Sequence, residues 1–215
     1  MARRPVFIST ERRPYAAEWY VDFVFNPGFA VSQKQKNILA LHEAFQEEFP
    51  GKRVLEISSK SLQPEGVALS AFNLMKYVPS LGRSVPVENV FQGGKVFADG
   101  GPYTDLLEKS AREAKRDERI RSGGELIAFE FEGEQYPVKP RTIFYDFIYM
   151  NALMENEELA QALMKYDAFT DIEFNPNRSV NCQAHTAAKF VSLAKAGLLD
   201  RIKSFEEFLQ LFSGR

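Results

Sequence analysis

The clearest hydrophobic pattern in the chain is helical and runs from Val85 to Phe97. Its apolar positions recur at steps of three and four residues, which is the period of an α-helix with one buried face. Pro86 comes two residues after Ser84, a good capping residue, and proline is favoured in the first turn of a helix. The pattern therefore predicts a helix whose buried face comprises Val87, Val90, Phe91, Gly94 and Phe97.

A polar stripe lies beside this apolar face. Glu88, Gln92 and Lys95 stand at i, i+4 and i+7, so one helix edge carries an acid, an amide and a cation. The pair Gly93-Gly94 lets another group approach the backbone closely. The alternative is an exposed ladder of side chains that adds only about a few tenths of a kcal/mol to helix stability. The pattern alone leaves both interpretations open.

The first sixty residues alternate between strand and helix signals. Residues 1–19 are punctuated by prolines and rich in polar side chains, so we expect an arm laid over the body of the protein. Residues 21–25 and 54–58 have the composition of short strands. Between them, Ser32 and Gln35 predict a capping box at the start of a helix.

Two lysines, Lys34 and Lys36, fall in the first turn of this helix, where the helix dipole disfavours cations. An anion bound at the helix start would explain the placement, with Ser32 and Lys34 as its candidate ligands. The alternative is that both lysines extend into solvent.

The second half of the chain is mostly helical by pattern. Residues 104–122 form a charged helix in which Arg112, Lys115 and Arg116 are adjacent donors suited to a diphosphate. A hairpin with a Glu132-Gly133 turn follows. Further helices are predicted at residues 142–154, 157–166, 181–196 and 204–212. These elements predict an α+β fold, a single and predominantly α-helical domain over residues 20–213 with a small β-sheet and a hairpin.

Composition narrows the classes of protein that fit. With 215 residues, of which 45% are hydrophobic, the chain can bury a substantial core. The net charge of −2 provides no global attraction to nucleic acid, so any such contact must be local. Two histidines and one cysteine cannot furnish a usual zinc site, and no apolar run approaches the ~20 residues of a membrane span. We therefore expect a cytoplasmic protein with no metal and no membrane partner.

Three stretches of the chain together resemble the NADAR family, whose name refers to NAD and ADP-ribose chemistry. Residues 69–73 look like the family's L-S-N-F segment, residues 86–97 resemble its P-T-x-E-H-x-x-Q-x-x-K-F helix, and residues 110–116 resemble its E-A-K-R segment. More narrowly, residues 26–36 and 169–176 look like the branch found as antitoxins beside DarT toxins.

The resemblance implies hydrolysis of an N-glycosidic bond to ribose. In the antitoxin branch this bond joins ADP-ribose to the exocyclic amine of a guanine that the toxin has modified in DNA. Modified DNA would then be the substrate, ADP-ribose the product and a DarT-type toxin the functional partner, and no cofactor is implied. Carried over by motif, Glu88 stands at the family's catalytic glutamate. The ligand-binding positions carried over are Asn73, Gln92, Lys95, Arg112, Glu113 and Lys115.

The chain departs from the family pattern in two places. Asn89 stands where the family commonly has a histidine after its glutamate. The family's D-x-x-W-G segment would fall around residues 178–182, where the chain reads R-S-V-N-C. A second catalytic acid is therefore not assigned by motif, and Asp146, Asp171 and Glu173 are its candidates.

The residues also fit this chemistry without the resemblance. Cleavage of a ribosyl–nitrogen bond builds positive charge on the sugar, which a nearby carboxylate stabilises, and the leaving amine needs a proton. Glu88 could stabilise that charge or activate water. Two other functions remain possible: an N-glycosidase acting on a free ribosylated metabolite of the riboflavin-pathway type, and a non-catalytic module that binds ADP-ribose.

Overall fold

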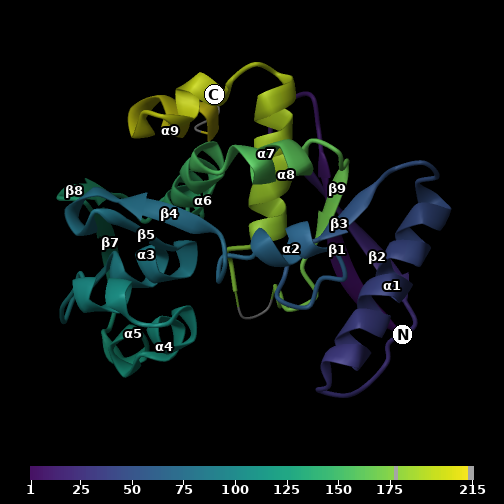
Figure 1. Cartoon of the computed structure of the whole chain (residues 1–215), viewed down its shortest axis with the longest axis horizontal. Helices are drawn as coiled ribbons and strands as arrows, with labels where there is room; N and C mark the ends of the chain where they lie inside the picture. Colours follow the sequence, from purple (N-terminus) through teal and green to yellow (C-terminus); the bar gives the residue numbers. More distant parts are fainter. Residues whose placement is uncertain (177–178, 213–215) are drawn as a thin grey trace. The chain divides into compact units, whose positions relative to one another are not determined.

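The computed structural model describes residues 1–176 and 179–212. The chain divides into two compact units, each of which combines two separate stretches of sequence (Figure 1). Unit 1 comprises Met1–Ser70 and Glu157–Arg201. Unit 2 comprises Ala71–Asn156 and the stretch that starts at Ile202.

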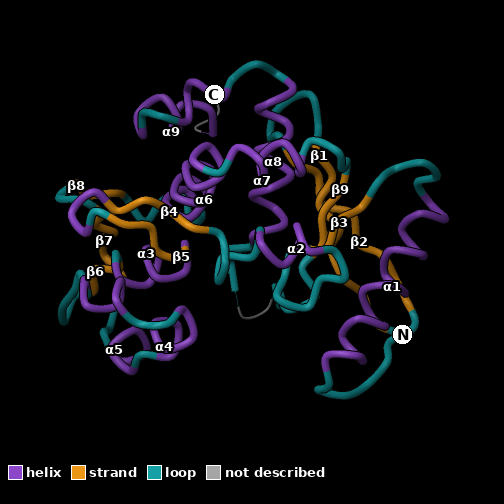
Figure 2. Tube along the Cα trace, in the orientation of Figure 1, coloured by secondary structure: helices purple, strands orange, loops and turns teal. Residues whose placement is uncertain are grey.

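Unit 1 contains a four-stranded sheet in the order β2-β1-β9-β3, drawn in orange in Figure 2. Strand β1 pairs antiparallel with β2 and with β9, and β9 pairs parallel with β3. The elements of this unit are β1 (Ala2–Ser9), β2 (Ala16–Phe23), α1 (Val31–Glu48), β3 (Val54–Glu56), α2 (Pro64–Ala68), α7 (Glu157–Leu163), β9 (Ala168–Thr170) and α8 (Gln183–Lys195).

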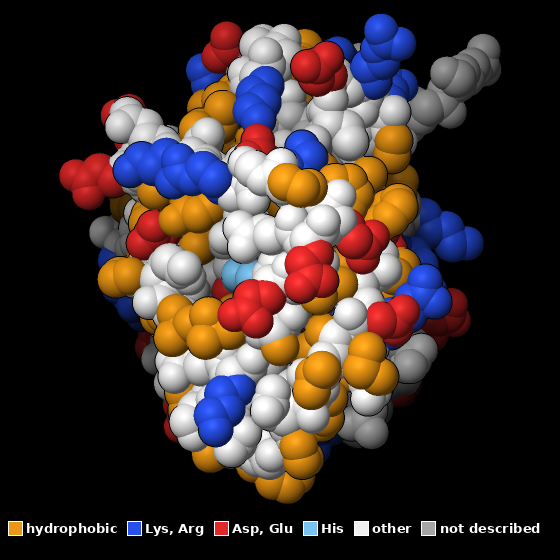
Figure 3. Space-filling view, turned by 90° about the vertical axis from the view of Figure 1, so that its right-hand side faces the viewer, with side chains coloured by type: hydrophobic (Ala, Val, Ile, Leu, Met, Phe, Trp, Pro, Cys, Tyr) orange, Lys and Arg blue, Asp and Glu red, His pale blue; other side chains and the backbone are white. Residues whose placement is uncertain are grey.

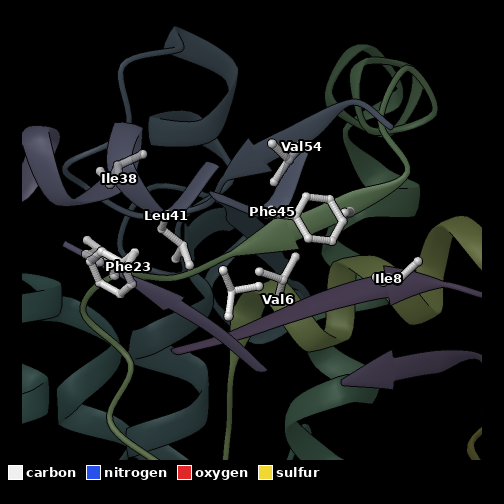
Figure 4. Close-up of a cluster of buried hydrophobic side chains, with 10 residues drawn as sticks. Val6, Ile8, Phe23, Ile38, Leu41, Phe45 and Val54 are labelled. Atoms are coloured by element: carbon white, nitrogen blue, oxygen red, sulfur yellow. The ribbon is translucent and has the colours of Figure 1, made fainter. Parts of the chain in front are cut away.

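Helices α1 and α8 pack on opposite faces of this sheet, because successive side chains of a strand point to opposite sides. Val6 and Ile8 of β1 join the hydrophobic cluster under α1, whereas the Phe7 ring between them stacks on His185 of α8, with ring centres 4.9 Å apart. Helix α1 contributes apolar residues at helical spacing to the cluster in Figure 4. The buried members of this cluster are Val6, Ile8, Val21, Phe23, Ile38, Leu41, Phe45, Val54, Ala168 and Ile172.

The prediction of a polar arm at residues 1–19 is wrong. Residues 2–9 form β1, which pairs along its whole length with β2 and buries Val6, Phe7 and Ile8. The expected boundary after residue 19 therefore falls inside β2. Pro5 is tolerated in β1 because β9 pairs only with Phe7 and Ile8, so no partner strand on that side needs its missing N–H.

Unit 2 contains two small sheets, one of β4 and β5 and one in the order β6-β7-β8. Its elements are β4 (Met75–Val78), η1 (Pro79–Leu81), β5 (Arg83–Pro86), α3 (Val87–Gly93), β6 (Lys95–Phe97), η2 (Thr104–Glu108), α4 (Ala111–Arg116), α5 (Glu118–Ser122), β7 (Leu126–Phe131), β8 (Glu134–Tyr136), α6 (Ile143–Glu155) and α9 (Phe205–Phe212). The short 3₁₀ helix η3 (Leu199–Ile202) spans the boundary between the two stretches.

The predicted hairpin is confirmed as β7 and β8. At its turn, Glu132 and Gly133 have φ angles of 53° and 78°, the two positive values that a type I′ turn requires. The aromatic helix predicted at residues 142–154 is confirmed as α6, and its Phe144 ring stacks on Phe129 of β7 with centres 4.5 Å apart. This stacking fixes the hairpin against the core of unit 2.

Two helix predictions in unit 2 are too long. The helix that starts after Pro86 ends at Gly93, and Lys95–Phe97 instead forms β6, which pairs with β7. The helix predicted over residues 104–122 is broken into η2, α4 and α5. Asp117 interrupts it in an extended conformation (φ −56°, ψ 132°), and its side chain accepts a hydrogen bond from Arg119 N.

The predicted α+β class, mainly helical with small sheets, is confirmed. Within the described ranges, no helix combines the length and the apolar character needed to cross a membrane. Residue 213, the predicted end of the domain, lies outside the described residues, as does residue 178 of the segment where the family's D-x-x-W-G motif would fall.

Candidate active site

Helix α3 places its polar side chains in the interior of unit 2. Glu88, Asn89 and Gln92 have exposed fractions of only 5%, 0% and 6%. The exposed side-chain ladder that the sequence also allowed is therefore excluded. Because a carboxylate is buried favourably only among charged or hydrogen-bonding groups, the partners of Glu88 define the candidate site.

The Glu88 carboxylate is held through one of its two oxygens. Oε1 accepts a hydrogen bond from Gln92 Nε2 at 2.9 Å and lies 3.6 Å from Lys115 Nζ. From the part of the chain that the structure describes, Oε2 accepts no hydrogen bond. One oxygen thus orients the carboxylate, and the other is left for a ligand or water.

Lys95 reaches the same group from β6. Its Nζ donates to Gln92 Oε1 at 2.7 Å and lies 4.7 Å from the centre of the Phe91 ring. The pKa of Lys95 is lowered to about 8, because burial and the nearby Lys115 ammonium together outweigh the opposing effect of the Glu88 carboxylate. Gln92 therefore bridges a carboxylate and an ammonium group with the two ends of one amide.

Helix α4 supplies Lys115 and two further residues predicted to bind ligand. Glu113 caps this helix, because its carboxylate accepts hydrogen bonds from Ser110, which lower its pKa. Arg112 is exposed and makes no hydrogen bond or ion pair with the described residues. Lys115 lies over the Phe72 ring, 4.9 Å from its centre. Arg112 and Lys115 thus stand on one short helix, and Lys115 borders Glu88.

Asn73 is exposed and belongs to the turn that leads into β4. This turn is tied to the start of α3, because Ala71 O accepts a hydrogen bond from Glu88 N at 2.9 Å. Residues 71–73 of the L-S-A-F-N segment and the glutamate helix are therefore neighbours in unit 2, as expected if both contribute to one ligand site.

The glycine pair after Gln92 admits the protein's own backbone. A Cβ atom on Gly94 would lie 2.7 Å from Glu130 O, and one on Gly93 would lie 3.2 Å from Tyr103 O. The two glycine carbonyls accept backbone hydrogen bonds from the same segments: Glu130 N donates to Gly94 O and Tyr103 N donates to Gly93 O, each at 2.7 Å. The close approach expected at this pair is thus explained by strand β7 and the segment before η2.

Ser32 and Lys34 belong to unit 1. The predicted capping box is wrong, because α1 starts at Val31 with Ala30 as its cap and no side chain caps it. Lys34 forms an ion pair with Glu173, with Nζ 3.2 Å from Oε1. A carboxylate of the protein thus accounts for a cation at this helix start without a bound anion.

Unit 1 contains a buried polar network that the sequence patterns do not predict. Glu56 of β3 is fully buried, and its Oε2 accepts a hydrogen bond from Thr170 Oγ1 at 2.6 Å. The single hydroxyl proton of Thr170 is used in this bond. His42 Nε2 lies 2.8 Å from Thr170 Oγ1 and must therefore donate to it. A glutamate within the apolar run Val54–Ile57 was the available signal.

The three candidates for a second acid differ in their surroundings. Asp146 is buried in α6 and accepts a hydrogen bond from Thr142 Oγ1 at 2.8 Å. Glu173 is exposed and paired with Lys34. Burial and the nearby Glu56 carboxylate raise the pKa of Asp171 to about 8. Asp171 therefore has the surroundings of a carboxyl group that holds its proton at neutral pH.

Figure 3 shows the side of the molecule on which Figure 1 labels α1, and its Lys and Arg side chains stand apart from one another among acidic and hydrophobic ones. This face therefore has no continuous basic patch. Across residues 1–176 and 179–212, no three His, Cys, Asp or Glu side chains are grouped as metal ligands.

The family model described as DarT1-associated NADAR antitoxin, NADAR-DarT1, matches residues 2–215. No curated protein matches the chain. The family match covers both units and includes Glu88, Gln92, Lys95 and Lys115.

Proposed function

Because the chain belongs to the family of DarT1-associated NADAR antitoxins, we propose that it removes ADP-ribose from guanine bases of DNA modified by a DarT-type toxin. The reaction is hydrolysis of the N-glycosidic bond between the ribose and the exocyclic amine of the base. Family membership supports an antitoxin role and pairing with such a toxin, and the bond and substrate are our proposal.

The observation that carries the proposal is the asymmetric hold on Glu88. A carboxylate bound through Oε1 and left open at Oε2 suits a reaction in which positive charge develops on the ribose. Gln92 and Lys115 hold Oε1, and thereby the whole carboxylate, in position before the substrate arrives. Oε2 then faces the anomeric carbon, or takes a proton from the water that attacks it.

The cations of α4 suit the remote part of the substrate. Arg112 is exposed and has no partner in the described part of the chain, so its guanidinium is available for a diphosphate. Lys115, on the same helix, lies 3.6 Å from Glu88 Oε1. The chain's net charge of −2 means that attraction to DNA must come from such local cations.

The direct test uses an oligonucleotide that carries one ADP-ribosylated guanine. Wild type is expected to release free ADP-ribose and restore unmodified guanine, which chromatography and mass spectrometry detect. Glu88→Gln is expected to lower the rate by ~10²–10³-fold or more, while its affinity for ADP-ribose changes little. Co-expression with a DarT-type toxin should show protection by wild type and none by Glu88→Gln.

Glu108→Gln is a matched control, because it makes the same change at an exposed carboxylate of unit 2. It is expected to retain the wild-type rate. Binding of modified oligonucleotide without release of ADP-ribose would support a binding module instead, and release only from a small ribosylated metabolite would support the metabolite N-glycosidase. A Glu88→Gln rate within threefold of wild type would remove Glu88 from the mechanism.

A further inference from the structure

Lys95 stands at the end of a fixed chain of contacts that leads to Glu88. Its Nζ donates to Gln92 Oε1 at 2.7 Å, and Gln92 Nε2 donates to Glu88 Oε1 at 2.9 Å. Because an ammonium group only donates and a carboxylate only accepts, the orientation of the amide between them is determined. One amide group separates the cation from the carboxylate, so both can reach atoms of a single ligand.

We propose that Lys95 is the proton donor to the departing base in the hydrolysis proposed above, on which this inference rests. An ammonium nitrogen carries three protons, and one of them is used at Gln92 Oε1. The remaining protons are available to a ligand on the open side of Glu88. The carboxylate and the ammonium group then act on the two partners of the same bond, the sugar and the base.

The reaction balances without an added reactant. The bond between the anomeric carbon and the guanine nitrogen breaks, the electron pair stays on that nitrogen, and Lys95 Nζ supplies its proton. A water oxygen forms the new bond to the anomeric carbon, and the water proton goes to Glu88 Oε2. Glu88 then releases a proton and Lys95 takes one up from solvent, which restores both groups and leaves ADP-ribose and unmodified DNA.

The surroundings of Lys95 suit a proton donor at neutral pH. A general acid works best when its pKa is near the working pH, and burial together with Lys115 brings that of Lys95 down to about 8. The charged groups that face it are Glu88 from α3 and Lys115 from α4. It also lies over the Phe91 ring, donates to Gln92 and has Phe129 as its cross-strand partner on β7, all of which are uncharged.

Lys95 and Lys115 differ in burial and in the group they contact, and this difference suits Lys95 to the role of proton donor. The Lys115 side chain is 55% exposed and lies 3.6 Å from Glu88 Oε1, so it acts as an exposed counter-charge of the carboxylate. Lys95 is partly buried and contacts the amide rather than the carboxylate. The structure thus distinguishes one lysine for charge and one for proton transfer.

The test compares wild type, Lys95→Met and Lys95→Arg on the ADP-ribosylguanine oligonucleotide, with single-turnover rates measured from pH 6 to pH 10. The wild-type rate is expected to fall about tenfold per pH unit above pH ~8, as the donor loses its proton. Lys95→Met should be ~10²-fold or more slower at pH 7 and should lack this decline. Lys95→Arg keeps the charge and a donor for Gln92 but cannot give up a proton, so it should be as slow as Lys95→Met.

Recovery of the rate in Lys95→Arg to within a few-fold of wild type would overturn the proposal, because charge and positioning would then suffice. An alkaline decline that persists in Lys95→Met would overturn it as well. Lys139→Met, at an exposed lysine of unit 2, is the control and should keep the wild-type profile. Unchanged circular dichroism spectra and a Kd for ADP-ribose within threefold of wild type show that the variants are folded.

A second measurement is independent of turnover. The amine of Lys95, labelled by ¹³C reductive methylation and identified by its absence in Lys95→Met, should titrate well below the other lysines. A Lys95 signal that titrates with the others would overturn the proposal. If wild type releases ADP-ribose and the Lys95 variants do too, only this inference fails. If wild type releases none, the proposed function fails and this inference with it.

Discussion

Asn89 shows how one residue changes role when a family pattern changes. The family commonly has histidine here, and the Asn89 carboxamide instead donates two hydrogen bonds, to Leu106 O at 2.8 Å and to Lys109 O at 2.6 Å. A neutral imidazole has a single N–H and cannot donate to both carbonyls. Because these carbonyls lie just before α4, Asn89 helps hold the helix that carries Lys115.

Replacing Asn89 by alanine removes the donor to two backbone carbonyls, of which Leu106 O still accepts a hydrogen bond from Lys109 N while Lys109 O loses the bond from Asn89. An acceptor left unpaired costs ~1–3 kcal/mol, so we expect Asn89→Ala to lower the free energy of unfolding by about 1–3 kcal/mol. Urea denaturation followed by circular dichroism measures this change. A loss below about 0.5 kcal/mol, the usual range for surface substitutions, would mean that water replaces the amide.

Arg112 presents the opposite case of a residue that the fold does not use. Since it is exposed and has no hydrogen bond or ion pair with the described residues, Arg112→Ala should leave the melting temperature unchanged. If it contacts the diphosphate, that contact exists in ground and transition states alike, so KM and the Kd for ADP-ribose should rise while kcat holds. Calorimetry and steady-state kinetics separate these quantities. Arg121→Ala, also exposed, is the control, and equal affinities of the two variants would show that Arg112 only faces solvent.

At the scale of elements, the junction between α3 and β6 sets the distance between Glu88 and Lys95. Helix α3 stops at Gly93, and the chain turns directly into a strand that pairs with β7. This turn is what brings Lys95 back to Gln92. It depends on the absence of side chains at Gly93 and Gly94, where Tyr103 O and Glu130 O approach the backbone.

The two glycines should respond differently to alanine. In Gly94→Ala the new Cβ would lie 2.7 Å from Glu130 O, a backbone atom that cannot move without shifting β7. Overpacking of this kind costs ~1–3 kcal/mol. In Gly93→Ala the nearest atom is 3.2 Å away, so a smaller loss is expected. Thermal melts of both variants check this order, and an equal or reversed order would show that the junction relaxes freely.

At the scale of the whole molecule, the buried titratable groups of unit 1 make stability depend on pH. Burial lowers the pKa of His42 to about 4, so its contribution is complete above pH 6.5 and is lost as the pH falls toward 4. The pKa of Asp171 is raised to about 8, so its contribution is present below pH 3.8 and is lost as the pH rises toward 8. Burial also raises the pKa of Glu56, which acts in the same direction as Asp171.

Between pH 6.5 and pH 8 the acidic groups of unit 1 outweigh Lys95, whose lowered pKa of about 8 acts in the opposite direction. Stability should therefore fall with rising pH, and Asp171 alone accounts for roughly 2 kcal/mol of this fall. Asp171→Asn cannot ionise and should flatten this decline. Urea denaturation at several pH values within the window measures the slope. Asp22→Asn, at an exposed carboxylate of β2, should keep the wild-type slope. A slope that is the same in Asp171→Asn and wild type would mean that Asp171 is already ionised at pH 6.5.

Local signals in the sequence were sufficient for several elements. The apolar period predicted α6, α7 and α8, and the Glu132-Gly133 pair predicted the hairpin of β7 and β8, because the responsible residues are neighbours in the chain. The same period placed Glu88 and Gln92 one turn apart on α3, which is the spacing of their hydrogen bond. For these features the sequence by itself was decisive.

The tertiary structure decided what depends on distant residues. Residues 2–9 became a buried strand because β2 and β9 pair with it, and Lys95 left the predicted helix because β7 offers a strand partner. The partners of Glu56 were beyond sequence reasoning, since Thr170 lies 114 positions away. Local periodicity records how a segment buries its own apolar side, whereas backbone pairing and the burial of a charged group depend on which other segments pack against it. That is why the sequence alone placed Glu88 and Gln92 on one helix, and only the folded chain decided which groups surround the Glu88 carboxylate.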